Sequence, residues 1–239
     1  GTAKFFSPHE VGFYEIIGHQ TMVALFGGAG LLAAASLSVA AIRYWRAIGL
    51  PAPSKVGTRN LLAGLVAAFT LRNLCGGAGE GCTWPEEEPS TSRRAFHHLV
   101  FYGFLLCFTA TVTGTIYHYG FDEVAPYPPF SLPKIFGTVG GVGILVGVTG
   151  LAWLRRKSTP SMEDRRGLAA SLMFLLFMTS LTGLLLMLLR QTSWLGLMLC
   201  VHLASVLALF MGMACGKFVH GLYRLIALIG YEVESQKAE

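Results

Sequence analysis

The sequence has 239 residues, of which 53% are hydrophobic and only 13% are charged. Because soluble domains carry about 25% charged residues, this composition excludes a soluble monomer and indicates an integral membrane protein. The formal net charge of +5 does not imply nucleic-acid binding, since membrane proteins gather a surplus of basic residues in cytoplasmic loops.

Five apolar segments are long enough to cross a hydrocarbon core of roughly 30 Å as helices. In chain order they are residues 22–42, 99–117, 135–154, 168–189 and 195–216. A sixth apolar segment, residues 61–74, is too short to span, and Arg59 and Arg72 favour a helix that lies at the membrane interface. The sequence therefore predicts one all-α domain over residues 1–239, an integral membrane bundle of five transmembrane helices with an interfacial helix in the loop 43–94.

Basic residues predict the orientation, because cytoplasmic loops carry an excess of Lys and Arg. Of the 18 Lys and Arg residues, 15 lie in the loops after the first and third spans or after the fifth span. Only Lys4, Lys134 and Arg190 lie on the other side. We therefore expect a multi-pass protein of the bacterial inner membrane, with residues 1–20 outside and the C-terminus in the cytoplasm.

The first cytoplasmic loop contains a glycine-rich segment, residues 75–82, with a cysteine at each end. These cysteines lack the close spacing of an iron–sulfur or zinc site. No βαβ unit surrounds the glycines, as a dinucleotide fingerprint requires. We therefore expect a structural turn, and the five cysteines, three of them in apolar segments, exclude a disulfide framework.

Polar groups inside membrane spans are costly in lipid and tend to be functional. All 13 acidic residues lie outside the predicted spans, so a proton relay or a cation path lacks obvious ligands. Five of the seven histidines lie at span ends: His97 and His98 at the start of the second span, His118 at its end, His202 near the start of the fifth, and His220 just after it. We expect His19 to be interfacial and His9 to be a solvated loop residue.

Helical geometry groups four of these histidines into two pairs. With about 100° per residue, the 18-residue step from His202 to His220 makes five whole turns and roughly 27 Å. The 21-residue step from His97 to His118 falls roughly 60° short of six turns, whereas the step from His98 leaves the side chains roughly 160° apart. Because the second and fifth spans are antiparallel, His97 then faces the level of His220, and His118 faces the level of His202. His98 is the alternative to His97.

Two such pairs match the requirement of two bis-histidine haems, since each low-spin iron takes two axial nitrogens from opposite sides of the macrocycle. The sequence has no Cys-x-x-Cys-His motif, so we expect non-covalent b-type haems. Propionate partners would be Arg93, Arg94, Lys217 and Arg224 inside, with Tyr117 and Tyr119 outside. Small residues that would let the rings approach the helices are Gly103, Gly114, Gly212 and Gly216. The alternative for each histidine is an interfacial residue that hydrogen-bonds to water or to a headgroup.

Several sequence blocks resemble the membrane part of the tricarballylate-utilisation protein B family, also called citrate-utilisation protein B. These blocks are residues 71–74, the glycine-rich loop to Cys82, and residues 93–98, 101–104, 116–119, 132–133, 137–141, 179–184 and 216–224. The likeness covers nearly the whole chain from about residue 71 onward. The chain is also similar in architecture to the gamma subunit of respiratory nitrate reductases, a five-span protein with two haems.

The resemblance implies an electron-transfer subunit of an oxidoreductase complex rather than its catalytic subunit. It would reoxidise the reduced flavin of a partner dehydrogenase that acts on tricarballylate or a similar polycarboxylate, and pass the electrons toward the quinone pool. Members of the family usually carry an N-terminal ferredoxin-like segment, so we expect the iron–sulfur cluster in a missing segment or in a partner at the cytoplasmic face. The alternative is a haem-free membrane anchor or a transporter.

Overall fold

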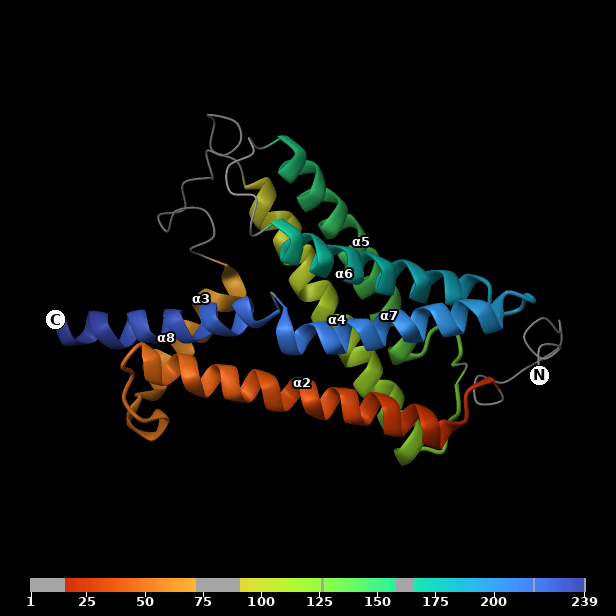
Figure 1. Ribbon diagram of the computed structural model, residues 1–239, viewed down its shortest axis with the longest axis horizontal. Helices are drawn as coiled ribbons and strands as arrows, with labels where there is room; N and C mark the ends of the chain where they lie inside the picture. Colours follow the sequence, from red (N-terminus) through yellow and green to blue (C-terminus); the bar gives the residue numbers. More distant parts are fainter. Residues whose placement is uncertain (1–15, 72–90, 126, 158–165, 217, 239) are drawn as a thin grey trace. The chain divides into compact units, whose positions relative to one another are not determined.

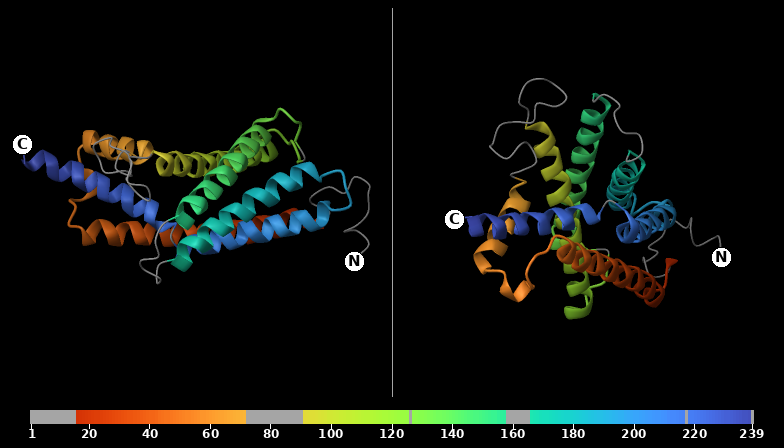
Figure 2. Two further views of the ribbon diagram at one scale, coloured as in Figure 1. Left: turned by 90° about the horizontal axis from the view of Figure 1, so that it is seen from above. Right: turned by 60° about the vertical axis from the view of Figure 1, so that its left-hand side comes forward.

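The computed structural model describes residues 16–71, 91–125, 127–157, 166–216 and 218–238. Within these ranges the chain forms helices and no strands (Figure 1), and Figure 2 shows the same helices from two further sides. The α-helices are α2 (His19–Ala47), α3 (Thr58–Thr70), α4 (Ser92–Gly120), α5 (Leu132–Lys157), α6 (Arg166–Leu188), α7 (Leu195–Cys215) and α8 (Val219–Ala238), and a 3₁₀ helix, η2 (Pro53–Lys55), precedes α3. The predicted all-α fold class is confirmed. The expected turn at residues 75–82 and the loop residue His9 lie outside the described residues.

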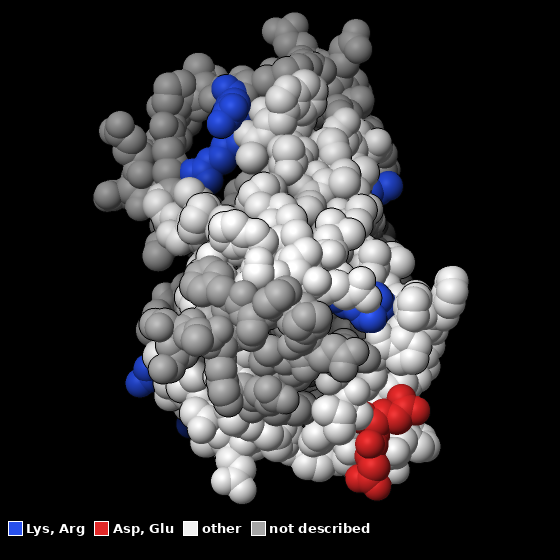
Figure 3. Space-filling view, turned by 90° about the vertical axis from the view of Figure 1, so that its right-hand side faces the viewer, with Lys and Arg blue, Asp and Glu red and all other residues white. Residues whose placement is uncertain are grey.

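Five of the described helices are long and apolar enough to cross a membrane. Their membrane-spanning parts are His19–Ala47, Ser92–Gly120, Leu132–Arg156, Ala170–Leu188 and Leu195–Met213. Each one overlaps a span predicted from the sequence, so the prediction of five spans is confirmed and the protein is a multi-pass membrane protein. On the face drawn in Figure 3, the basic and acidic side chains lie in small separate groups, between areas that carry neither.

The described chain divides into two compact units. The first unit contains α2 up to Gly28, α4 from Ala95, α5, α6, and α7 up to Leu209. The second unit contains the rest of α2 with η2 and α3, and the chain from Phe210 onward with α8. Four of the five candidate spans therefore contribute most of their length to the first unit.

In the first unit, α4 and α5 run antiparallel and touch along a seam of small residues. A Cβ built on Gly103 would lie 2.8 Å from the carbonyl oxygen of Gly140, and a Cβ built on Gly140 would lie 2.6 Å from the carbonyl oxygen of Gly103. A Cβ on Gly147 would lie 2.7 Å from the carbonyl oxygen of Phe96. The two backbones therefore approach to a distance that only glycine allows, which is typical of tightly packed membrane helices.

The α4 side of this seam has a regular spacing. Contacts with α5 recur at alternating steps of four and three residues: Phe96, Val100, Gly103, Cys107 and Ala110. Such a repeat keeps one face of a helix against its partner, as in a coiled coil. One face of α4 thus remains against α5 over about four turns.

We expect Gly140→Ala to destabilise the protein, because the new methyl group would meet atoms of Gly103 and Cys107 at 2.6 to 2.9 Å. Overpacking of this kind costs about 1–3 kcal/mol. The control is Gly137→Ala, one turn earlier on α5, where a Cβ would approach only the Cβ of Ala110, at 3.8 Å. Thermal unfolding in detergent should give Gly140→Ala the lower midpoint. Equal midpoints for the two variants would contradict the tight seam.

The glycine block at residues 137–141 packs α5 against two helices at once. Gly140 faces α4, whereas a Cβ on the next residue, Gly141, would lie 3.3 Å from Leu184 of α6. Successive residues of a helix point about 100° apart, so adjacent glycines serve different neighbours. Packing therefore explains one of the blocks on which the family resemblance rests.

In the second unit, α3 packs against α8. The buried residues of α3 are Asn60, Gly64 and Ala67, whose spacing places them on one helical face. A Cβ on Gly64 would lie 2.6 Å from the Ile229 side chain of α8, so a glycine is required at this contact. The opposite face of α3 exposes apolar side chains, among them Leu62 at 62%.

The short helix predicted at residues 61–74 is confirmed as a helix, with different bounds. It begins at Thr58 and ends at Thr70, because the next residue, Leu71, adopts a left-handed conformation with φ of 50°. The Leu71 N–H still donates to the carbonyl oxygens of Ala67 and Ala68, which closes the last helical turn. The position of this helix at the membrane interface stays a prediction.

The sequence analysis missed α8. Its buried residues Ile226, Ile229 and Val233 recur at helical spacing and belong to the core of the second unit. Charged residues of this helix, Arg224, Glu232 and Glu234, keep it too polar for a membrane span, and the sequence analysis predicted no helix after residue 216. Tyr223 of α8 also stacks on Tyr44 of α2, with ring centroids 4.6 Å apart.

Candidate functional site

The three histidines of the second span lie on one continuous helix, α4, of 29 residues, as the register argument requires. At 100° per residue, His97 lies roughly 100° from the face that contacts α5, and His98 lies roughly 200° from it. His98 is therefore on the side away from α5, where its ring stacks with Tyr102 at 5.7 Å between centroids. The two candidates for the inner site thus have different surroundings, and the choice of His97 stays a prediction.

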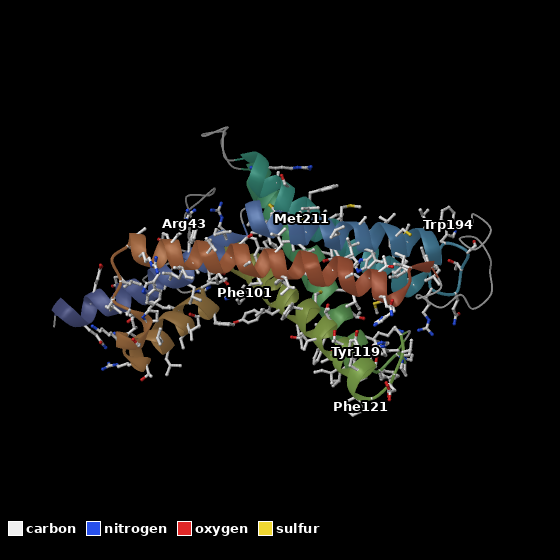
Figure 4. All side chains as sticks on the ribbon, turned by 60° about the horizontal axis from the view of Figure 1, so that its bottom comes forward. Arg43, Phe101, Tyr119, Phe121, Trp194 and Met211 are labelled. Atoms are coloured by element: carbon white, nitrogen blue, oxygen red, sulfur yellow. The ribbon has the colours of Figure 1, made fainter. Side chains whose placement is uncertain are left out.

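At the other end of α4, His118 lies against a histidine to which the sequence analysis gave no role. The ring centroids of His19 and His118 are 4.5 Å apart, and His19 Nε2 lies 3.0 Å from the hydroxyl oxygen of Tyr119. Figure 4 shows Tyr119 and Phe121 at this end of α4. The order of the spans could have indicated the contact between His19 and His118, because α2 begins on the side of the membrane where α4 ends.

His202 lies in the third turn of α7, and its ring faces α6. Its Nδ1 is 3.1 Å from the hydroxyl oxygen of Thr182, and a Cβ built on Gly183 would lie 3.0 Å from its Cε1. The structure therefore places His118 against α2 and His202 against α6. That one haem joins His118 and His202 stays a prediction.

His220 lies in the first turn of α8, not on the fifth span, and the register expected from His202 is wrong. The helix is interrupted between Cys215 and Val219, so five whole turns of one helix do not connect the two histidines. A Cβ on Gly216 would lie 2.5 Å from the Gly212 carbonyl oxygen, so this bend requires a glycine. His220 belongs to the second unit and His97 to the first, and their pairing stays a prediction.

Gly103 and Gly114 of α4 do not leave room for a haem ring, although the sequence analysis expected these small residues to let a ring approach the helix. The backbone of α5 fills the space beside Gly103, as the seam shows. The aromatic ring of Tyr127 fills the space beside Gly114, and the Tyr127 hydroxyl donates a hydrogen bond of 2.9 Å to the Gly114 carbonyl oxygen. Any cofactor beside α4 must therefore use its other faces.

The basic residues that the sequence analysis predicted as propionate partners lie near the starts of helices. Arg93 and Arg94 occupy the first turn of α4, which has no acidic residue, and Arg224 lies in the second turn of α8. Lys217 lies outside the described residues. Cations are unfavourable at a helix N-terminus because of the helix dipole, so helix stability does not explain Arg93 and Arg94. Arginine side chains and the N–H groups of a first helical turn are both groups that bind carboxylates.

The side chains at the ends of the described spans determine which cofactors the chain could bind. The spans offer imidazole nitrogens at their ends and contain no Asp or Glu, while basic side chains flank the first turn of α4. Imidazoles on apolar helices fit a haem, which takes only two protein ligands per iron, and the arginines fit its propionates.

These features define a class of protein, the multi-pass helical membrane protein with histidines at its span ends. The chain belongs to the citrate utilization protein B family, whose sequence signature matches residues 6–239. It is 42% identical over 231 residues to the citrate utilization protein B of Escherichia coli, an alignment that covers 95% of this chain and 60% of that relative. The chain therefore spans about three-fifths of the length of this curated relative. No solved structure matches the chain.

Proposed function

We propose that the chain is a membrane di-haem cytochrome b that passes electrons from a partner dehydrogenase toward the quinone pool. The partner would be a flavin or iron–sulfur enzyme of citrate utilisation, as the name of the family suggests, or of tricarballylate utilisation, as the sequence resemblance implies. The observation that carries the proposal is the placement of histidines at both ends of α4, an apolar helix without acidic residues.

Four histidines would provide the axial nitrogens, His97 and His220 at the inner site and His118 and His202 at the outer site. A bound haem supplies a one-electron redox centre. The residues of the chain would bind and orient it: the imidazoles would hold the iron, and Arg93, Arg94 and Arg224 would hold the propionates by charge-assisted hydrogen bonds. The spans contain no carboxylate that would carry a coupled proton, so we propose an electron conduit and not a pump.

The donor would dock at the cytoplasmic face, on which the charge bias predicts the starts of α4 and α6 and the end of α5. Arg155 and Arg156 lie in the last turn of α5. The Phe96 ring of α4 occupies the space that a Cβ on Gly150 would need, so α4 from Ala95 onward lies beside this end of α5. The charge bias predicts Arg93, Arg94, Arg155, Arg156 and Arg166 on this side of the membrane, and their positive charges would steer an acidic iron–sulfur or flavin protein toward it.

The cofactor content tests the proposal directly. The pyridine haemochrome assay on the purified membrane protein should give two b-type haems per chain, and the absorption spectrum should be that of low-spin haem. A protein without haem would be a membrane anchor or a transporter instead. A chain with one haem would retain the electron-transfer role but contradict the two-pair assignment.

A further inference from the structure

The ring of His202 rests on a pair of α6 residues that the proposed function does not yet use. Thr182 is buried, with 3% of its surface exposed, and its hydroxyl oxygen lies 3.1 Å from His202 Nδ1. The next residue, Gly183, lies under the ring, since a Cβ there would be 3.0 Å from Cε1 and 3.4 Å from Nδ1. The ring is thus held from one side, with Nδ1 directed toward α6.

The hydrogen bonds of Thr182 indicate the direction of its hydroxyl hydrogen. The Thr182 hydroxyl donates to the backbone carbonyl oxygen of Met178 at 2.6 Å, and more weakly to that of Thr179 at 3.3 Å. A carbonyl oxygen only accepts, so the single hydroxyl hydrogen is engaged there. With that hydrogen engaged, the Thr182 oxygen can accept a hydrogen bond from His202 Nδ1–H. The backbone of Thr179 is a further hydrogen-bond partner of the ring, and its carbonyl oxygen also requires a ring N–H as donor. In a neutral imidazole with a protonated Nδ1, Nε2 keeps its lone pair.

We infer that Thr182 and Gly183 are positioning residues that hold His202 as its Nδ1–H tautomer and present Nε2 as the nitrogen that binds haem iron. The inference rests on the proposed function in one respect, the identity of the metal group. Histidines that bind metals almost always donate their other ring N–H to an acceptor, which fixes the ring and raises its basicity as a ligand. The chain His202 Nδ1–H, Thr182 hydroxyl, Met178 carbonyl is such an arrangement.

The same two residues belong to the block 179–184, to which the sequence analysis assigned no chemistry. The contacts of the His202 ring explain why a threonine and a glycine are adjacent in this block. Thr182 supplies the acceptor, and Gly183 supplies the space, because any larger residue would displace the ring. The block 179–184 therefore contains the residues that position His202 of the neighbouring helix α7.

The test compares Thr182→Val with Thr182→Ser in the purified holoprotein. Valine keeps the shape but removes the acceptor, whereas serine retains it. Because a less basic axial imidazole stabilises ferric iron less, Thr182→Val should raise the midpoint potential of one haem and leave the other unchanged. It should also weaken retention of that haem by roughly 10-fold or more. Thr182→Ser should restore both properties, and Gly183→Ala should weaken retention of the same haem.

The matched control is Thr179→Val, one turn earlier on α6, where the hydroxyl is buried but has no hydrogen-bond partner among the described residues. It should leave both potentials unchanged. The inference is overturned when the wild-type protein holds two haems and Thr182→Val matches it in potential and in haem retention.

A haem-free wild-type protein would defeat the proposed function but still test the tautomer. Histidine ¹⁵N spectra of the protein, with His202 assigned through His202→Gln, should show a protonated Nδ1 in the wild type. A protonated Nε2 would overturn the inference independently of any haem.

Discussion

Replacing His118 by alanine should lower the number of low-spin haems from two per chain to one, and His202→Ala should do the same. In the proposed assignment an alanine would leave the iron with one histidine ligand, and the haem would then become high-spin or dissociate. His97→Ala and His220→Ala should remove the other haem, so that combining His97→Ala with His118→Ala should remove both. The measurements are the pyridine haemochrome assay and electron paramagnetic resonance of the ferric protein.

Two further variants make this series decisive. His19→Ala is the matched control at the outer site, because the His19 ring lies 4.5 Å from His118 but is not an assigned ligand. It should keep both haems low-spin. Loss of a haem in His19→Ala together with two low-spin haems in His202→Ala would show that His19, and not His202, is the partner of His118. At the inner site, His98→Ala should keep both haems, and the reverse result would exchange His97 for His98.

Reversing the charge of Arg155 and Arg156 together should slow the reduction of the haems by the partner dehydrogenase. Electrostatic steering raises association rates by about 10- to 1,000-fold at low salt, and glutamates at these positions would oppose an acidic donor. The experiment reduces the dehydrogenase with its substrate, adds the protein in membranes with the iron–sulfur module, and follows haem absorbance. A quinone analogue should then reoxidise the haems.

The control lies on the same helix. Lys134 is near the start of α5, at the opposite end from Arg155 and Arg156, and Lys134→Glu should leave the rate of reduction unchanged. Equal slowing in the two variants would contradict docking at the predicted cytoplasmic face. Haems that stay oxidised in the wild type, although a chemical reductant reduces them, would refute the electron-transfer role itself.

The five spans could be predicted because their signal is simple. Each is a long apolar segment, and only a helix of that length satisfies its backbone in lipid. The α8 helix gives a weaker signal, since residues such as Arg224 and Glu232 interrupt its apolar periodicity and its stability depends on packing with α3. Its start at Val219 also invalidates the expected register between His202 and His220.

The candidate site was predicted only in part, for reasons of packing. A sequence shows that Gly103 and Gly114 are small, but not whether a cofactor, a helix or an aromatic ring fills the space beside them. The contact of His19 with His118 joins residues 99 positions apart and depends on how α2 and α4 meet. The role of Thr182 depends on the direction of one hydroxyl hydrogen, which can be inferred only from the contacts of Thr182 with Met178 and His202.

The seam between α4 and α5 also affects the order of folding. The two helices are neighbours in the chain, and contacts of short sequence separation form early because they close small loops. The backbones meet directly at Gly103 and Gly140, so this helical hairpin needs no cofactor to complete it. The continuous helix α4 then fixes the separation of His97 and His118 without a cofactor. A haem bound as proposed would therefore enter a scaffold that helix packing has already formed.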